Sequence, residues 1–119
     1  HSLGTVIAYE ALCRDPRNVR TLITLGSPIG IPTLVYDKLR PTDGWIARAE
    51  GRVRVRPEIE HWYNFSDPGD LIALVKKIGP LFEGSIHDFS ISTGRNAPHS
   101  VEKYLTDPEV GRAIRTGWP

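Results

Sequence analysis

Residues 1–12 read HSLGTVIAYEAL and place a serine, Ser2, just before a stretch with a helical pattern. Small residues at positions 4, 8 and 11 share one face with Leu12, so a helix here could approach a sheet closely. The pattern stops at Pro16, because proline disfavours a helical conformation for the residue before it. We therefore expect a helix over residues 4–14 that begins two residues after a serine.

The segments that follow alternate between strand and helix patterns. VRTLITLGSP (residues 19–28) is a short apolar run ended by turn residues, which suits a strand buried on both faces of a parallel sheet. Further strands are predicted in HWYNFS (61–66) and SIHDFSISTG (85–94). Helical turns are predicted over 31–41 and 71–79, and two short helices within 97–119, separated near Asp107 and Pro108. This order predicts an α/β fold with a mainly parallel sheet, in which residues 1–119 belong to a single domain.

Residues 42–60 are irregular and rich in glycine and turn residues. Within them Arg52, Arg54 and Arg56 alternate with valines, so one face of an extended piece carries three arginines. The expected arrangement is the solvated face of an edge strand, and the alternative is a patch for anions or nucleic acid.

The amino-acid composition of the chain disfavours several classes of binding partner. The chain has 15 Lys and Arg against 14 Asp and Glu, a net charge of +1, so no strong field attracts nucleic acid or an anionic membrane. Its single cysteine, Cys13, cannot form an internal disulfide and is expected in the core. No apolar run approaches the ~20 residues of a membrane-spanning helix, and no cluster of Cys and His predicts a metal site.

The letters around Ser2 predict a nucleophile. A serine hydroxyl reacts poorly unless a base, an orienting carboxylate and oxyanion donors surround it. HSLG matches the last four letters of G-x-S-x-G, a strand-to-helix turn whose glycines are expected to relieve crowding around the serine. Since the sequence also has no methionine, we expect the chain to be the C-terminal portion of a longer domain, with glycine preceding His1.

Four stretches together resemble the C-terminal half of an α/β-hydrolase-fold serine hydrolase of the lipase/esterase-like kind: HSLGT (1–5), LITLGSP (22–28), WYNFSDPGDLIAL (62–74) and NAPHSVEKYL (96–105). The resemblance implies a parallel sheet flanked by helices, with the early strands and the second oxyanion donor upstream. It also implies that Ser2 is the nucleophile and that the backbone N–H of Leu3 is an oxyanion donor. The alternative for Ser2 is an ordinary serine at the start of a helix.

The resemblance further implies that an acid follows the nucleophile in the chain and precedes the base. FSDPGDLIA offers Asp67 and Asp70. Asp70, with the apolar residues 71–73 behind it, fits the position of the acid better. Asp67 precedes a proline and is expected to bond the local backbone as a turn residue. The alternative for both is that they only shape the loop and cap the next helix.

Four histidines are candidates for the base. His1 adjoins the nucleophile in a place that is not the base in this family, and His61 comes too early in the chain order. His87 falls inside a predicted strand, where we expect a partly buried structural histidine. His99 lies on a polar loop after the last strand and just before a helix, so it is the predicted base. The alternative is a histidine that merely begins a helix.

These residues predict a serine hydrolase that cleaves an ester, thioester or related acyl bond through Ser2, Asp70 and His99. We expect no cofactor, no metal, a small-molecule acyl or ester substrate, and a cytoplasmic location. An acyltransferase with the same three residues and a non-catalytic binding module of the same fold are the alternative functions. The complete set of three residues disfavours the binding module.

Overall fold

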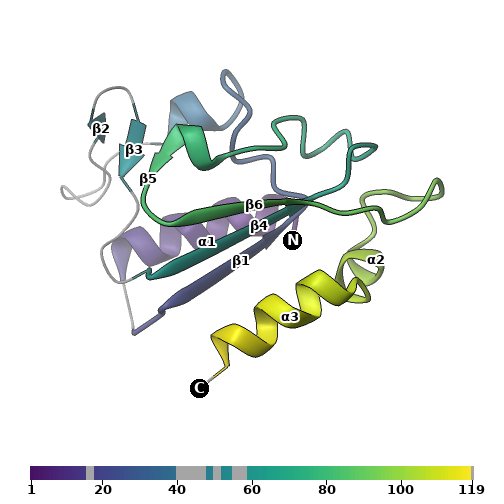
Figure 1. The fold of residues 1–119 in the computed structure, drawn as a ribbon. Helices are drawn as coiled ribbons and strands as arrows, with labels where there is room; N and C mark the ends of the chain where they lie inside the picture. The colour runs from purple at the N-terminus through teal and green to yellow at the C-terminus, as the bar shows by residue number, and fades with distance from the viewer. Residues whose placement is uncertain (16–17, 40–47, 50–51, 55–58, 119) are drawn as a thin grey trace.

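The computed structural model describes residues 1–15, 18–39, 48–49, 52–54 and 59–118 of the 119-residue chain. Its centre is a parallel sheet of three strands, β1 (Thr21–Leu25), β4 (His61–Ser66) and β6 (Ile86–Ser90), in the order β1-β4-β6. Tyr63 of β4 pairs with Ile23 on one side and with His87 on the other. Since all three strands run the same way, their carboxyl ends meet at one edge, next to the N-terminus (Figure 1). The predicted α/β class and parallel sheet are thus confirmed.

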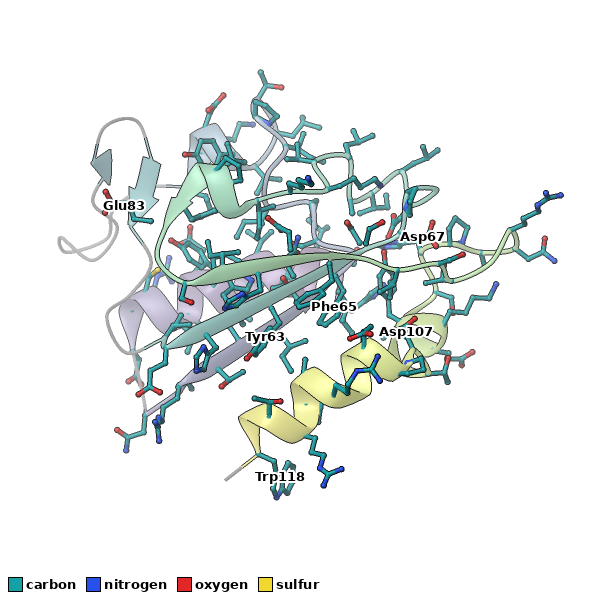
Figure 2. All side chains as sticks on the ribbon, in the orientation of Figure 1. Tyr63, Phe65, Asp67, Glu83, Asp107 and Trp118 are labelled. Atoms are coloured by element: carbon teal, nitrogen blue, oxygen red, sulfur yellow. The ribbon has the colours of Figure 1, made fainter. Side chains whose placement is uncertain are left out.

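Helices lie on both faces of this sheet, with α1 (Leu3–Arg14) on one side and α3 (Pro108–Gly117) on the other (Figure 1). Because strand side chains alternate, Leu22 and Trp62 face α1, and Leu25 and Phe65 face α3. Figure 2 shows Tyr63 and Phe65 between the sheet and α3. Two apolar cores result, one on each face of the sheet, and Cys13 is buried in the first, as predicted.

The face of α1 that packs on the sheet differs from the predicted one. The buried positions are Thr5, Tyr9 and Cys13, spaced four residues apart, whereas Gly4 and Ala11 are exposed. The ring of Tyr9 stacks on Trp62 with centroids 5.4 Å apart, so large side chains rather than small ones make the contact. Favouring the small residues was wrong because an aromatic pair fills this space.

The helix predicted over residues 71–79 does not form. Asn64 and Ser66 of β4 donate side-chain hydrogen bonds to the carbonyl of Lys76, and Asp88 of β6 accepts the N–H groups of Ile78 and Gly79. Side chains of the sheet therefore satisfy backbone groups that a helix would have paired internally.

The remaining elements are short. The helix predicted over 31–41 is reduced to turns and a 3-10 turn, η1 (Tyr36–Lys38). A second 3-10 turn, η2 (Gly79–Leu81), precedes β5 (Phe82–Glu83). The two predicted C-terminal helices are α2 (Val101–Leu105) and α3, and Asp107 caps α3 through the N–H of Glu109, 2.8 Å away. Of the helices in the described ranges, none has the length and apolar character to cross a membrane.

A second, small sheet contains part of the arginine segment. Its strands are β2 (Arg48–Ala49), β3 (Arg52–Arg54) and β5, in the order β2-β3-β5. The prediction of an edge strand is wrong, because β3 lies between two others: it pairs antiparallel with β2 and parallel with β5. Arg56 lies outside the described residues.

Candidate active site

The three predicted site residues meet at the carboxyl edge of the parallel sheet. The N–H of Ser2 donates to the carbonyl of Leu25 at the end of β1, with a distance of 3.0 Å. Asp70 lies on the turn after β4, and His99 on the loop between β6 and α2. Parallel topology thus brings together residues far apart in the chain, at the edge where sites of such sheets collect.

The ring of His99 contacts the side chains of both Ser2 and Asp70. Its Nδ1 lies 2.8 Å from Asp70 Oδ2, and its Nε2 lies 2.9 Å from Ser2 Oγ. An ionised carboxylate only accepts hydrogen bonds, so Nδ1 carries a proton and donates a hydrogen bond to Asp70. In a neutral ring Nε2 is then the acceptor, and the Ser2 hydroxyl donates to it. This is the hydrogen-bond arrangement that a serine needs in order to lose its proton to an imidazole.

Ser2 is held in an unusual backbone conformation. Its φ is 55° and its ψ is −139°, a region that non-glycine residues seldom adopt. Thr5 donates two hydrogen bonds to the Ser2 carbonyl, from its N–H at 3.0 Å and from its hydroxyl at 2.6 Å. The Ser27 hydroxyl donates in turn to the Thr5 hydroxyl, at 2.5 Å, since the proton of Thr5 is already engaged. Ser27, on the loop after β1, is thus linked through Thr5 to the Ser2 carbonyl, and this loop supports the turn that carries Ser2.

The structure bears differently on the predictions for Leu3 and Gly4, the two residues after Ser2. Leu3 is the first residue of α1, so its N–H has no acceptor within the helix. Its role as a donor stays a prediction. Gly4 lacks the crowding expected of it, because a Cβ added there would meet no atom within 4 Å among the described residues outside the helix's own nearby backbone.

Four donors surround the Asp70 carboxylate, which has no exposed surface. Oδ2 accepts from His99 and from the Tyr104 hydroxyl, and Oδ1 accepts from the N–H groups of Ile72 and Ala73. Burial alone would raise the pKa of this carboxyl, but the hydrogen bonds outweigh it and hold the pKa below the usual value. Asp70 is therefore ionised at neutral pH and suited to orient His99.

Asp67 has the turn-forming role that the sequence predicted, and a second role besides. Its Oδ1 accepts the N–H of Gly69 at 2.6 Å, within its own turn. Its Oδ2 accepts the N–H and the hydroxyl of Thr93, at 2.5 and 2.9 Å. Since Thr93 belongs to the loop that leads to His99, Asp67 links the turn that carries Asp70 to the loop that carries His99. Figure 2 shows Asp67 beyond the carboxyl end of β4.

The contacts of the other three histidines do not involve the Ser2 hydroxyl. His1 donates from Nε2 to the carbonyl of His99 at 2.9 Å, and the two rings are 4.5 Å apart. His61 and His87 lie on the strands, with rings 6.4 Å apart. The predicted partial burial of His87 is wrong. Its side chain is exposed on β6, one of the two edge strands of the sheet, and its Nε2 contacts the Ser85 hydroxyl at 3.2 Å.

Sequence reasoning missed Tyr104, which has no exposed surface. Its hydroxyl donates to Asp70 Oδ2 at 2.7 Å and accepts the N–H of Asp67 at 3.0 Å. Burial, followed by the hydrogen bond to Asp70, raises the pKa of this phenol, so it stays protonated and remains a donor. The only signal in the sequence was an aromatic residue five positions after His99, within a predicted helix.

No group of three or more His, Cys, Asp or Glu side chains in the described part of the chain could hold a metal ion. Comparisons with protein-family models, with curated proteins and with solved structures found no match for this chain.

Proposed function

We propose that this protein is a serine hydrolase of the α/β-hydrolase kind, which cleaves an ester, thioester or related acyl bond. The observation that carries the proposal is the contact series from Ser2 Oγ through both ring nitrogens of His99 to Asp70 Oδ2, with distances of 2.9 and 2.8 Å. The strained backbone of Ser2 and the fully buried Asp70 add support, because both are features of a nucleophile presented on a sharp turn and a base held in one tautomer.

The reaction follows from these contacts. Ser2 Oγ attacks the acyl carbon while His99 Nε2 takes the hydroxyl proton, and the Leu3 N–H faces the oxygen on which negative charge develops. As the carbonyl re-forms, the bond to the leaving oxygen or sulfur breaks, and His99 returns the proton to that atom. Water then attacks the acyl-serine with His99 again as base, which releases the carboxylic acid and restores Ser2. Asp70 stabilises the charged ring in both halves.

A fluorophosphonate probe tests the proposal, because it modifies only a serine that is activated in this way. We expect the protein to be labelled, and labelling to be lost in Ser2→Ala and strongly reduced in His99→Ala. Ser85→Ala is the matched control: Ser85 also contacts a histidine, but among the described residues no carboxylate bonds the ring of His87. Unchanged labelling in Ser2→Ala would overturn the proposal.

A further inference from the structure

An apolar groove adjoins Ser2 at the carboxyl edge of the sheet. It has a volume of about 440 Å³, and Ser2 and Leu3 are among the residues that line it. One wall comes from the loop after β1 and the other from the segment after Asp70. The principal side chains of the two walls are Ile31, Leu34, Val35, Leu71, Ile72 and Leu74.

Exposed aliphatic surface is concentrated at this groove. Ten large hydrophobic side chains are exposed in the described part of the chain, and five of them, Leu3, Leu34, Leu71, Ile72 and Leu74, line the groove. Apolar surface gathered in this way marks a place that binds something apolar. Another hollow, of about 420 Å³, lies at the opposite edge of the sheet, but the Arg20–Glu60 ion pair lines it and it is far from Ser2 in the fold.

The wall after Asp70 is shaped by the same carboxylate that faces His99. Asp70 Oδ1 accepts the N–H groups of Ile72 and Ala73, which fixes the turn. Ala73 then points inward and is buried, whereas its neighbours Leu71, Ile72 and Leu74 point outward. The Asp70 side chain thus contacts both His99 and the start of this wall.

We infer that this groove binds the aliphatic acyl chain of the substrate, so that the substrate class is an ester or thioester of an aliphatic carboxylic acid whose chain carries no charge. The inference rests on the proposed function, because it requires the acyl carbon to lie at Ser2 Oγ. Ser2 lines the groove, so an extended chain attached to the acyl carbon would lie between the two walls. No charged side chain lines the groove within the described residues, so an acyl chain that ended in a carboxylate would lose water there without gaining a partner.

The test is a series of p-nitrophenyl esters in which only the acyl group changes, from acetyl to octanoyl. Burial of each added methylene should raise kcat/KM about three- to fourfold until the groove is filled. The hemisuccinate ester should be cleaved much more slowly than the butyryl ester of the same length. A parallel pair, ethyl acetate and octyl acetate, puts the chain on the alcohol instead, and we expect no comparable gain there.

Variants that add one carboxylate to the groove test whether the groove causes the dependence of kcat/KM on acyl length. Leu34 and Leu71 are 66% and 77% exposed, so their replacement does not threaten the core. We expect Leu34→Glu and Leu71→Glu each to lower kcat/KM for the octanoyl ester about tenfold more than kcat/KM for the acetyl ester. Ile7→Glu is the matched control, since Ile7 is 70% exposed on α1 and does not line the groove. It should leave the dependence on chain length unchanged.

The outcomes separate this inference from the proposed function. If a small ethyl fluorophosphonate labels Ser2 and esters are cleaved without regard to acyl length, the inference is overturned and the hydrolase stands. An equal gain from octyl acetate, or an equal loss in Ile7→Glu, overturns it as well. If Ser2 is not labelled and no ester is cleaved, both proposals fail.

Discussion

The hydroxyl of Tyr104 donates a hydrogen bond of 2.7 Å to Asp70 Oδ2, the same oxygen that faces Nδ1 of His99. Tyr104 belongs to α2, which follows directly after the loop that carries His99, whereas Asp70 lies on the turn after β4. The same hydroxyl accepts the N–H of Asp67, so one buried side chain fixes both ends of the acid's turn. The orientation of Asp70 thus depends on α2 as well as on its own turn.

Tyr104→Phe should therefore lower both kcat and stability. Removal of the hydroxyl takes one donor from a buried carboxylate and leaves the Asp67 N–H without its acceptor, at a cost of about 1.5–3 kcal/mol. We expect kcat to fall about tenfold, because a less firmly held carboxylate orients His99 less well. Chemical denaturation and steady-state kinetics measure the two effects.

Tyr36→Phe is the matched control for this change. Tyr36 is also buried, and its hydroxyl donates at 2.7 Å to the carbonyl of Leu81, away from Ser2. This variant should lose stability and keep its kcat. An equal fall of kcat in the two variants would mean that Tyr104 acts only through the stability of the fold.

Substitution by asparagine should have different effects at the two candidate acids. In Asp70→Asn the side chain no longer stabilises the charged ring of His99, so kcat should fall by orders of magnitude, up to roughly 10⁴-fold, with the fold intact. In Asp67→Asn an N–H₂ group meets the donors of Thr93 or Gly69, so the main effect should be a loss of stability of about 1–3 kcal/mol. The reverse order of the two effects on kcat would mean that the acid is Asp67.

The sequence was sufficient for the α/β class, the parallel sheet and the convergence of Ser2, Asp70 and His99. Short motifs placed Ser2, Asp70 and His99 each on a turn after a strand or before a helix, and parallel topology then requires such turns to converge. What it did not predict depends on contacts between distant segments. The helix expected over 71–79 is absent because Asn64 and Asp88 bond its backbone, and Tyr104 is recognisable as a partner of Asp70 only once α2 lies against the turn after β4.

Stability should fall in acid, because Asp67 and Asp70 both have a lowered pKa in the folded chain. For Asp67, as for Asp70, burial raises the pKa, but the hydrogen bonds from Thr93 and Gly69 outweigh it. A lowered pKa means that the unfolded chain binds more protons, so the stabilisation is complete above the unfolded value of about 3.9 and is lost as pH falls through the folded value. Thermal unfolding between about pH 7 and pH 2 measures this loss.

Asp67→Asn tests that attribution. The variant lacks one of the two titrating groups, so its Tm should lie below that of the parent protein at neutral pH and approach it in acid. A gap in Tm that stays constant over the whole range would show that the ionisation of Asp67 contributes nothing.

Gly26 should not tolerate alanine, for two independent reasons. Its φ is 57°, in the left-handed region that side chains disfavour. An added Cβ would also lie 2.6 Å from Asp70 Oδ2 and 3.1 Å from His99 Nδ1, too close for either atom to stay in place. The backbone cannot easily yield, because the Gly26 N–H donates to the carbonyl of Phe65 at 2.9 Å. The methyl group would thus push directly into the contact between acid and base.

We therefore expect Gly26→Ala to lose at least about 100-fold in kcat, as misplacement of a catalytic group by about 1 Å commonly does, together with a lower Tm. Gly111→Ala in α3 is the control, since a Cβ there meets nothing within 4 Å among the described residues outside the helix's own nearby backbone. It should keep full activity and gain up to about 1 kcal/mol, because alanine favours a helix more than glycine does. Full activity in Gly26→Ala would contradict the close packing of Gly26 against Asp70 and His99, since that packing leaves no room for a methyl group while the two side chains remain in contact.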